Sequence, residues 1–316
     1  MSELRQNPLT GQWVILAENR GARPQDVVVQ QILRDAADCP FCAGHEARTP
    51  HETFAIRESC SRRDGPGWQV RVVPNKFPAL EAKQGAHEIV IESPQHLASV
   101  TQLSDAQFAD VLETYRHRLA ALHRSKQYHS AILFKNGGPT AGATLAHVHS
   151  QVLASASPDA LDQTRADAFR RAAVEKSCPL CRMLRDETGQ KTRVVAQSKN
   201  FTAFCPYAAR FAYETWIVPH QHLRHFDEIE EDESAELAEL FRALLVKLEA
   251  IVKLPAYNYI VHTAPFDTSV AEHYHWHIEI LPRIANLAGF ELGTGTFINT
   301  VSPDKAAESL RNAPLS

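Results

Sequence analysis

The stretch Ala146-His147-Val148-His149-Ser150-Gln151 is echoed in the second half of the chain by Tyr274-His275-Trp276-His277-Ile278-Glu279. Each stretch follows a Cys-Pro-x-Cys pair, Cys39/Cys42 for the first and Cys178/Cys181 for the second. Landmarks that recur in the same order predict an internally repeated chain. The copies differ at their last residue, because Gln151 is neutral and can hydrogen-bond to a phosphate whereas Glu279 would repel one. We therefore expect the first copy to be reactive and the second to be structural.

Composition excludes several classes of protein. The 316 residues carry 33 Lys and Arg against 37 Asp and Glu, a formal net charge of −4, so a surface that coats nucleic acid is not expected. The amino terminus has no cationic stretch before an apolar run, and no apolar segment approaches the ~20 residues that a membrane span needs. Four of the 6 cysteines belong to the two pairs, which in a reducing compartment indicates metal ligation rather than disulfides. We expect a cytoplasmic protein that binds neither nucleic acid nor membrane.

Two amphipathic helices strengthen the repeat. Ser104 and Gln107 form a predicted capping box, after which apolar side chains recur with the 3.6-residue period of a helix. Apolar positions of the second half have the same spacing, each 129 positions later, as Leu237 follows Phe108. The two stripes are Phe108, Val111, Leu112, Tyr115, Leu119 and Leu122, and Leu237, Leu240, Phe241, Leu244, Leu248 and Ile251. On the first helix, His117 and His123 are interpreted as solvated residues without a role.

Strand-like apolar runs flank each predicted helix. Residues 88–92 and 215–218 each lead to a proline, which ends a strand, and short apolar runs at 131–134 and 259–262 follow the helices. A strand–helix–strand unit written twice predicts an α+β fold, with helices packed on antiparallel sheets in two similar lobes. We place the lobes at residues 1–165 and 166–316.

Both Cys-Pro-x-Cys pairs are followed by histidines that could complete a zinc site. Zinc favours a tetrahedron of thiolates and imidazoles, in which a Cys-x-x-Cys turn supplies two sulfurs. A thioredoxin-like redox pair is the alternative for one such turn, but two pairs with the same order of histidines favour metal. We predict two structural Zn²⁺ sites, with iron as an option at the second, where His262, His273 and His277 are competing donors. The predicted ligands are Cys39, Cys42, His96 and His147 for the first site, and Cys178, Cys181, His222 and His275 for the second.

The segment around His149 carries the predicted chemistry. Residues two apart on an extended segment face the same way, so His147, His149 and Gln151 line one side. With His147 bound to metal, His149 is positioned without being a ligand, and the glycine-rich loop at 134–144 can approach phosphate oxygens closely. We expect His149 to be a nucleophile that forms a phosphoramidate, with Gln151 stabilising the charged phosphate oxygens. The alternatives for His149 are a third metal ligand or the general base of a hydrolase.

These residues resemble the galactose-1-phosphate uridylyltransferases, which are nucleotidyltransferases of the histidine-triad superfamily. The resemblance covers nearly the whole chain, and its most specific parts are the His-x-His-Ser-Gln segment, residues 275–283 and residues 289–291. It implies two histidine-triad-like lobes. It also implies a homodimer whose active sites draw on both subunits, with a nucleotide sugar and a hexose 1-phosphate as substrates.

The resemblance also implies substrate-binding roles for phosphate-binding arginines near the amino terminus, a nucleotide-binding asparagine, phosphate-contacting loop residues and a hexose-binding glutamate. The arginines are Arg20 and Arg23, and the asparagine is Asn75. The loop residues are Asn136, Gly142 and Thr144, and the glutamate is Glu291. Lys76 stands where the sugar-pathway enzymes have an acidic residue, and Phe290 where a tyrosine helps to hold the hexose. The second Cys-Pro-x-Cys pair resembles the branch of the family that includes an ADP-glucose phosphorylase.

Three functions are compatible with these features. The leading hypothesis is a ping-pong uridylyltransferase, in which His149 takes UMP from UDP-glucose and passes it to galactose 1-phosphate. The second keeps the same histidine but uses ADP-glucose, or a dinucleoside polyphosphate, together with inorganic phosphate. The third is a zinc-stabilised, non-catalytic nucleotide-binding protein in which His149 is only structural.

Overall fold

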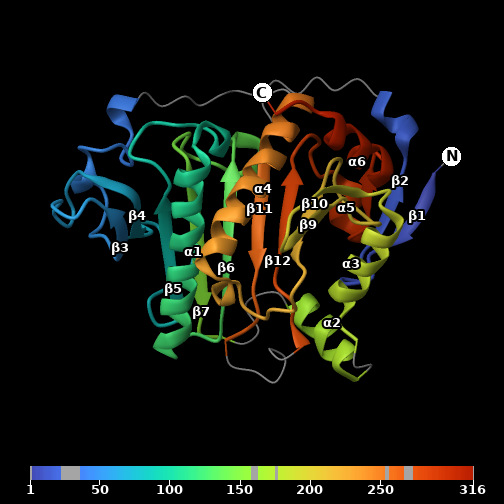
Figure 1. Ribbon diagram of the computed structural model, residues 1–316, viewed down its shortest axis with the longest axis horizontal. Helices are drawn as coiled ribbons and strands as arrows, with labels where there is room; N and C mark the ends of the chain where they lie inside the picture. The colour runs from blue at the N-terminus through green and yellow to red at the C-terminus, as the bar shows by residue number, and fades with distance from the viewer. Residues whose placement is uncertain are drawn as a thin grey trace.

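A computed structural model of the chain describes residues 2–22, 36–157, 163–174, 177–252, 256–266 and 273–315. Within these residues, a ten-stranded antiparallel sheet forms the centre of the molecule. Helices α1 (Asp105–Ser125) and α4 (Glu231–Ile251) lie side by side across one face of this sheet (Figure 1). Sheets covered by helices in this way confirm the predicted α+β class.

The remaining elements are as follows. The other helices are α2 (Gln163–Val174), α3 (Pro179–Gln190), α5 (Gly289–Thr294) and α6 (Pro303–Asn312). The large sheet consists of β3 (Phe54–Arg57), β4 (Trp68–Pro74), β5 (Gly85–Ile91), β6 (Ser130–Gly137), β7 (His149–Ser155), β8 (Val194–Gln197), β9 (Phe201–Phe204), β10 (Thr215–Pro219), β11 (Tyr257–His262) and β12 (His277–Pro282). A small sheet consists of β1 (Glu3–Gln6), β2 (Trp13–Leu16) and β13 (Phe297–Asn299). Short 3-10 helices near the sites described below are η1 (Glu18–Ala22), η4 (Val100–Gln102), η5 (Pro139–Ala141) and η6 (Phe226–Glu228).

The strand order of the large sheet reads as a palindrome of the two halves of the chain. It runs β3-β4-β5-β7-β6 through the first half and β11-β12-β10-β9-β8 through the second. β6 and β11 pair antiparallel at the centre, where Lys135 lies opposite Tyr259. The repeat in the sequence is therefore a repeat in the structure, with an approximate two-fold axis between β6 and β11.

Helix α1 begins where the capping box predicts. The Ser104 hydroxyl accepts a hydrogen bond from the Gln107 amide at 3.2 Å, and the Gln107 side chain accepts one from the Ser104 amide at 2.9 Å. The predicted apolar stripes of α1 and α4 are buried, except that Ile251 is partly exposed. The rings of Phe108 and Phe241 meet edge to face, 5.4 Å apart, where the two helices cross the sheet. Burial of each large side chain contributes about 2 kcal/mol to this packing.

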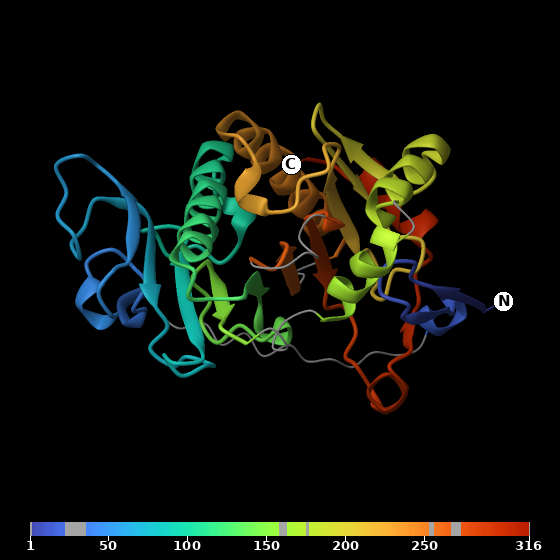
Figure 2. The same cartoon turned by 90° about the horizontal axis from the view of Figure 1, so that it is seen from below.

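The amino-terminal strands join the carboxyl-terminal end of the chain. β1 pairs antiparallel with β2, and β2 pairs in parallel with β13. Figures 1 and 2 show this small sheet at the same end of the molecule as α3, α5 and α6. The predicted boundary after residue 165 falls within α2, and the division into lobes at that point remains a prediction. No helix in the described ranges is both long enough and apolar enough to span a membrane.

Candidate active site and metal centres

The first predicted ligand set comes together just before β7. Cys39, Cys42, His96 and His147 place their donor atoms within 4.8 Å of one another. Nδ1 of His147 lies 3.5 Å from Sγ of Cys39 and 3.6 Å from Sγ of Cys42, which is 3.3 Å from Nδ1 of His96. Tetrahedral zinc separates a sulfur from a nitrogen ligand by about 3.5 Å, so the donor set fits Zn²⁺. Nε2 of His147 donates to the Ser93 carbonyl at 2.8 Å, which turns Nδ1 toward the ion position.

The second predicted set repeats this arrangement atom for atom. Nδ1 of His275 lies 3.7 Å from Sγ of Cys178 and 3.5 Å from Sγ of Cys181, which is 3.3 Å from Nδ1 of His222. Nε2 of His275 donates to the Pro219 carbonyl at 3.2 Å. This donor set also fits a tetrahedral Zn²⁺ ion, and the competing histidines are not part of it.

His149 is held in one tautomer at the start of β7. Its Nδ1 donates to the carbonyl oxygen of His147 at 2.7 Å, so the lone pair of the neutral ring is on Nε2. Burial, reinforced by the charge of Lys135, lowers the pKa of His149 below its ordinary value and favours the neutral ring. Phe41, inside the first Cys-Pro-Phe-Cys turn, contacts the His149 ring with 5.3 Å between centroids. The turn from Cys39 to Cys42 therefore packs against His149, which is not itself part of the donor set.

A buried polar network supports this segment from the side of α1. Ser150 alternates with His149 along β7, and its hydroxyl hydrogen-bonds to Glu92 and to Tyr115 of α1. Nζ of Lys135 donates to Glu92 at 2.6 Å and to the carbonyl oxygen of His149 at 2.8 Å. A buried charge is tolerated when it is paired and hydrogen-bonded, and this pair also fixes the backbone of His149. No sequence motif marks Glu92 or Lys135, so motif reading missed them.

Gln151 is oriented by a histidine that the sequence motifs do not reveal. Its Oε1 accepts a hydrogen bond from Nε2 of His87 at 2.8 Å. Nδ1 of His87 accepts from the Ala79 amide at 3.1 Å, which places the ring proton on Nε2. Gln151 therefore presents its amide N–H groups as donors. Nδ2 of Asn75 lies 3.3 Å from the His87 ring, so the predicted nucleotide-binding residue and Gln151 share one neighbour.

Glycines shape the loop that follows β6. Gly138 and Gly142 have positive φ angles of 84° and 92°, a conformation that favours glycine. Asn258 of β11 donates through Nδ2 to the side-chain oxygen of Asn136 at 2.8 Å. A Cβ added at Gly142 would lie 3.5 Å from the Asn136 amide nitrogen, so the two predicted phosphate-contacting positions are adjacent.

The strand register brings this loop toward the predicted nucleophile. Phe134 of β6 pairs with Gln151 of β7, so the next residues of β6 run toward the level of His149. Asn136 is therefore placed near the reactive segment, while Thr144 is exposed on the connection between the loop and β7. The chain thus gathers Asn75, Asn136 and Gly142 around the neighbouring strands β5, β6 and β7.

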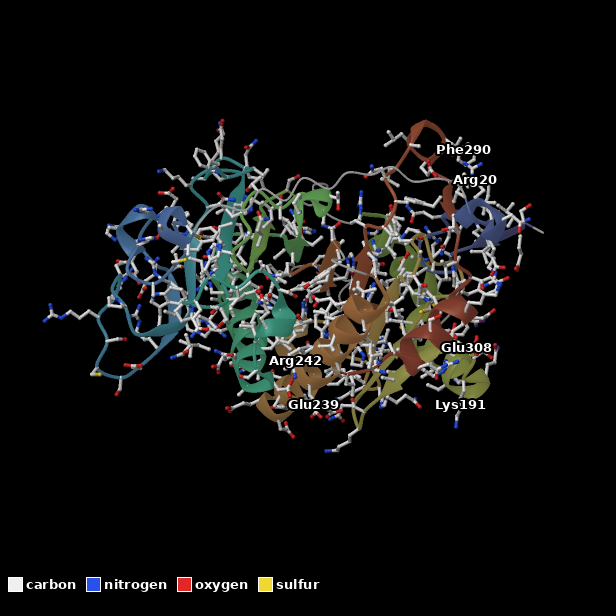
Figure 3. All side chains as sticks on the ribbon, turned by 90° about the horizontal axis from the view of Figure 1, so that it is seen from above. Arg20, Lys191, Glu239, Arg242, Phe290 and Glu308 are labelled. Carbon is white, nitrogen blue, oxygen red and sulfur yellow. The ribbon has the colours of Figure 1, made fainter. Side chains whose placement is uncertain are left out.

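Arg20 and Glu291 lie elsewhere in the molecule. The segment that carries η1 hydrogen-bonds to β13, and Glu291 caps α5 by accepting a hydrogen bond from the amide of residue 288 at 3.1 Å. Figure 3 shows Arg20 and Phe290 at one corner of the molecule. A single chain therefore does not bring Arg20 or Glu291 to His149. Arg23 lies outside the described residues.

Comparisons with known proteins identify the family of the chain. A family model described as a domain of unknown function, DUF4921, matches residues 83–313. An ADP-glucose phosphorylase of Arabidopsis thaliana is 30% identical over 99% of this chain and 93% of its own length. A galactose-1-phosphate uridylyltransferase of Thermotoga maritima is 29% identical over 100% of this chain and 99% of its own. The chain belongs to the galactose-1-phosphate uridylyltransferase family.

A solved structure of the same family supports the whole fold. The crystal structure of an ADP-glucose phosphorylase from Arabidopsis thaliana with bound ADP-glucose matches this chain with a TM-score of 0.86 and 31% sequence identity. The match covers 99% of this chain and 100% of the other, so no large part of the fold is particular to this member of the family.

In this chain, the second copy of the His-x-His segment, which contains His275 and His277, is buried. His277 donates through Nδ1 to the His275 carbonyl at 3.2 Å, the same tautomer-fixing contact that His149 makes. However, His277 is 0% exposed, and its ring stacks on His262 with 4.8 Å between centroids. The ring of His277 is therefore shielded from solvent, whereas His149 is 8% exposed.

Glu279, at the position equivalent to Gln151, is held in buried ion pairs. Its carboxylate pairs with Arg165 at 2.5 Å and with Arg210 at 2.7 Å. Burial alone would raise the pKa of Glu279, but the two arginines hold it well below its ordinary value, so the carboxylate is charged. Arg165 and Arg210 are thus already paired with the buried carboxylate of Glu279, in agreement with a structural role for the second copy.

Proposed function

We propose that this chain is a nucleotidyltransferase that acts on nucleotide sugars through a covalent nucleotidyl-histidine at His149. The observation that carries the proposal is the 2.7 Å hydrogen bond from Nδ1 of His149 to the His147 carbonyl, because it leaves the Nε2 lone pair for attack on phosphorus. Gln151, two residues further along β7, supplies N–H donors for the phosphate oxygens.

In the first half-reaction, Nε2 of His149 attacks the α-phosphorus of the nucleotide sugar. The N–P bond forms, the bond from this phosphorus to the bridging oxygen breaks, and hexose 1-phosphate leaves with the electron pair. The ring becomes cationic, and the His147 carbonyl stabilises the charge through Nδ1–H. In the second half-reaction, an oxygen of the phosphate acceptor attacks the same phosphorus, the N–P bond breaks and His149 returns to its neutral form.

Two substrate pairs are candidates for this site. Phosphorolysis of ADP-glucose, which would yield ADP and glucose 1-phosphate, is favoured by the 30% identity and the TM-score of 0.86 to proteins named for that activity. The second Cys-Pro-x-Cys pair and the departures at Lys76 and Phe290 favour the same candidate. Uridylyl transfer from UDP-glucose to galactose 1-phosphate is supported by the 29% identity to the Thermotoga maritima relative over both full lengths.

We further propose that both Cys/His sets hold Zn²⁺ and that the active unit is a homodimer. The zinc ions would stabilise the fold and fix the segment before His149. A dimer would let Arg20 and Glu291 of one subunit reach His149 of the other. Exposed apolar side chains are available for such an interface, among them Phe77 (83% exposed) and Leu292 (74% exposed).

Incubation with ADP-glucose or UDP-glucose labelled at the α-phosphate tests the catalytic proposal. We expect a base-stable, acid-labile label on the protein, and the nucleotide that labels faster identifies the base. His149→Asn should abolish labelling, whereas His51→Asn, at a side chain that is 91% exposed, should label like the parent protein. If neither nucleotide sugar labels the metal-loaded protein, the non-catalytic nucleotide-binding alternative is favoured instead.

A further inference from the structure

A further group of side chains that could hold a metal ion lies where α1 meets η6. His123 belongs to the last turns of α1. Asp227 belongs to η6, and His225 is the residue before η6. Their donor atoms lie within 4.8 Å of one another, the same bound that holds for the two Cys/His sets. Nδ1 of His123 is 3.8 Å from Oδ2 of Asp227, and the two imidazole rings are 4.8 Å apart.

Buried atoms of this group have no hydrogen-bond partner. His225 is only 4% exposed, and its Nδ1 makes no hydrogen bond. Oδ1 of Asp227 is also buried without a partner. Buried polar atoms in native proteins are nearly always satisfied, so each such atom calls for an explanation. A cation bound by the three side chains is one such explanation.

The internal repeat supplies a comparison within the same molecule. By the repeat that relates His96 to His222, Ser99 and Thr101 of the η4 region occupy the positions of His225 and Asp227. Their hydroxyls donate to the carboxylate of Glu249, near the end of α4, at 2.5 and 2.8 Å. At the contact between η4 and α4, in the first copy, the polar side chains therefore satisfy one another through hydrogen bonds. The second copy instead brings together two imidazoles and a carboxylate.

We propose that His123, His225 and Asp227 bind a divalent transition-metal cation, separately from the two Cys/His sites. Two imidazole nitrogens and one carboxylate oxygen form a donor set that suits Zn²⁺ or Fe²⁺, and three ligands leave further positions for water or a ligand. The ring of Phe266 stacks on His123 with 4.8 Å between centroids and provides an apolar wall for the site. The site joins the helix of the first half to the η6 segment of the second.

Cobalt binding to the full-length protein tests this proposal. Co²⁺ bound at the Cys/His sites produces thiolate charge-transfer absorption, whereas Co²⁺ bound by nitrogen and oxygen alone does not. After equilibration with Co²⁺ and removal of the excess, we expect the parent protein to hold about one equivalent more than either Asp227→Asn or His123→Ala. The charge-transfer band per protein should be unchanged in both variants, which also reports that the fold and the other sites are intact.

The matched control is Thr101→Ala at the repeat-related junction, which should hold as much Co²⁺ as the parent protein. Anomalous scattering from a Co²⁺-loaded crystal should show a peak between His123, His225 and Asp227. Equal cobalt content in the parent protein and in Asp227→Asn, or no anomalous peak at this position, would overturn the proposal. Because metal rather than turnover is measured, the result is independent of the proposed catalytic function.

Discussion

At the scale of single residues, the site depends on how three imidazoles share their ring nitrogens. His147 directs Nδ1 toward the cysteine sulfurs and Nε2 toward a carbonyl, whereas His149 directs Nδ1 toward a carbonyl, which leaves the lone pair of its neutral ring on Nε2. His87 uses both nitrogens to orient Gln151. Each ring therefore has a defined tautomer, and a defined tautomer determines which atom can bind metal, attack phosphorus or donate a proton.

The role of His87 leads to a first prediction. His87→Ala should lower the rate of nucleotidyl transfer by about tenfold, because Gln151 loses the partner that directs its amide toward phosphate. Single-turnover labelling of His149 is the appropriate measurement. His87→Gln, which can still donate to Gln151, should recover part of the rate, and an unchanged rate in His87→Ala would contradict this role for His87.

His117 leads to a prediction about pH. It is not the fully solvated residue expected from the sequence, because its ring stacks on Phe54 with 3.9 Å between centroids and burial lowers its pKa below 6.5. Below pH 6.5 the unfolded chain binds more protons at this position than the folded chain, so this contribution to stability is lost as the pH falls. His117→Phe keeps the stacking and cannot titrate.

The free energy of unfolding in urea, measured between about pH 7.5 and about pH 5.5, checks this prediction. It should fall more steeply with decreasing pH for the parent protein than for His117→Phe. Equal pH dependence in the two proteins would show that the folded-state pKa of His117 is not depressed.

The sequence indicates some of these residues and not others, for a physical reason. His147 and His149 are recognisable because their spacing is local and tied to a cysteine pair, and the structure brings His147 together with the other predicted ligands. His87 lies 64 positions before Gln151 and meets it only because β5 pairs with β7. Contacts between residues on paired strands can be predicted only when the register of the two strands is known.

At the scale of elements, the first Cys-Pro-Phe-Cys turn links the proposed zinc site to the strand that carries His149. Cys39 and Cys42 flank Phe41, whose ring touches both His147 and His149. The second turn has Leu180 at the position of Phe41, buried in an apolar cluster beneath α3. We therefore expect the first turn to influence catalysis and the second to influence mainly stability.

A matched pair of variants checks this difference. Cys42→Ser and Cys181→Ser should each remove one equivalent of zinc, measured by elemental analysis. Cys42→Ser should lower kcat by up to about 10²-fold, because a displacement of His149 near 1 Å has an effect of this size. Cys181→Ser should lower the melting temperature while the labelling rate of the folded protein stays near that of the parent. Similar losses of kcat in both variants would contradict the separation.

The helices were predictable as elements because their signals are local. The capping box and the apolar stripe of α1 lie within one continuous segment, and the structure confirms both. The pairing of β2 with β13 is different, since it joins residues near the two ends of the chain. No local pattern specifies such a partner, so neither these strands nor the pairing of β2 with β13 was predicted from the sequence.

At the scale of the whole molecule, the distribution of predicted binding residues favours two cooperating chains. His149 and Gln151 lie on β7, whereas Arg20 and Phe290 lie at the corner formed by η1 and α5 (Figure 3). A site assembled from two subunits of a symmetric dimer would occur twice.

Complementation between inactive variants checks this arrangement. His149→Asn and Glu291→Ala should each be inactive alone, and subunits exchanged in equal amounts should recover about one quarter of the parent activity. The reason is that half of the dimers are mixed and each mixed dimer holds one intact site. Light scattering should give the mass of a dimer. A monomeric active protein, or no recovery after exchange is demonstrated, would show that the site does not cross subunits.

The antiparallel seam between β6 and β11 has a consequence for how the two halves could diverge. In an assembly of identical separate chains, every substitution appears on both sides of the axis, so an anion-binding amide cannot be replaced by an acid on one side alone. When both repeats belong to one chain, each can change its sequence independently of the other. Gln151 and Glu279 fit this reasoning, since one half has an amide oriented by His87 where the other has a carboxylate paired with Arg165 and Arg210.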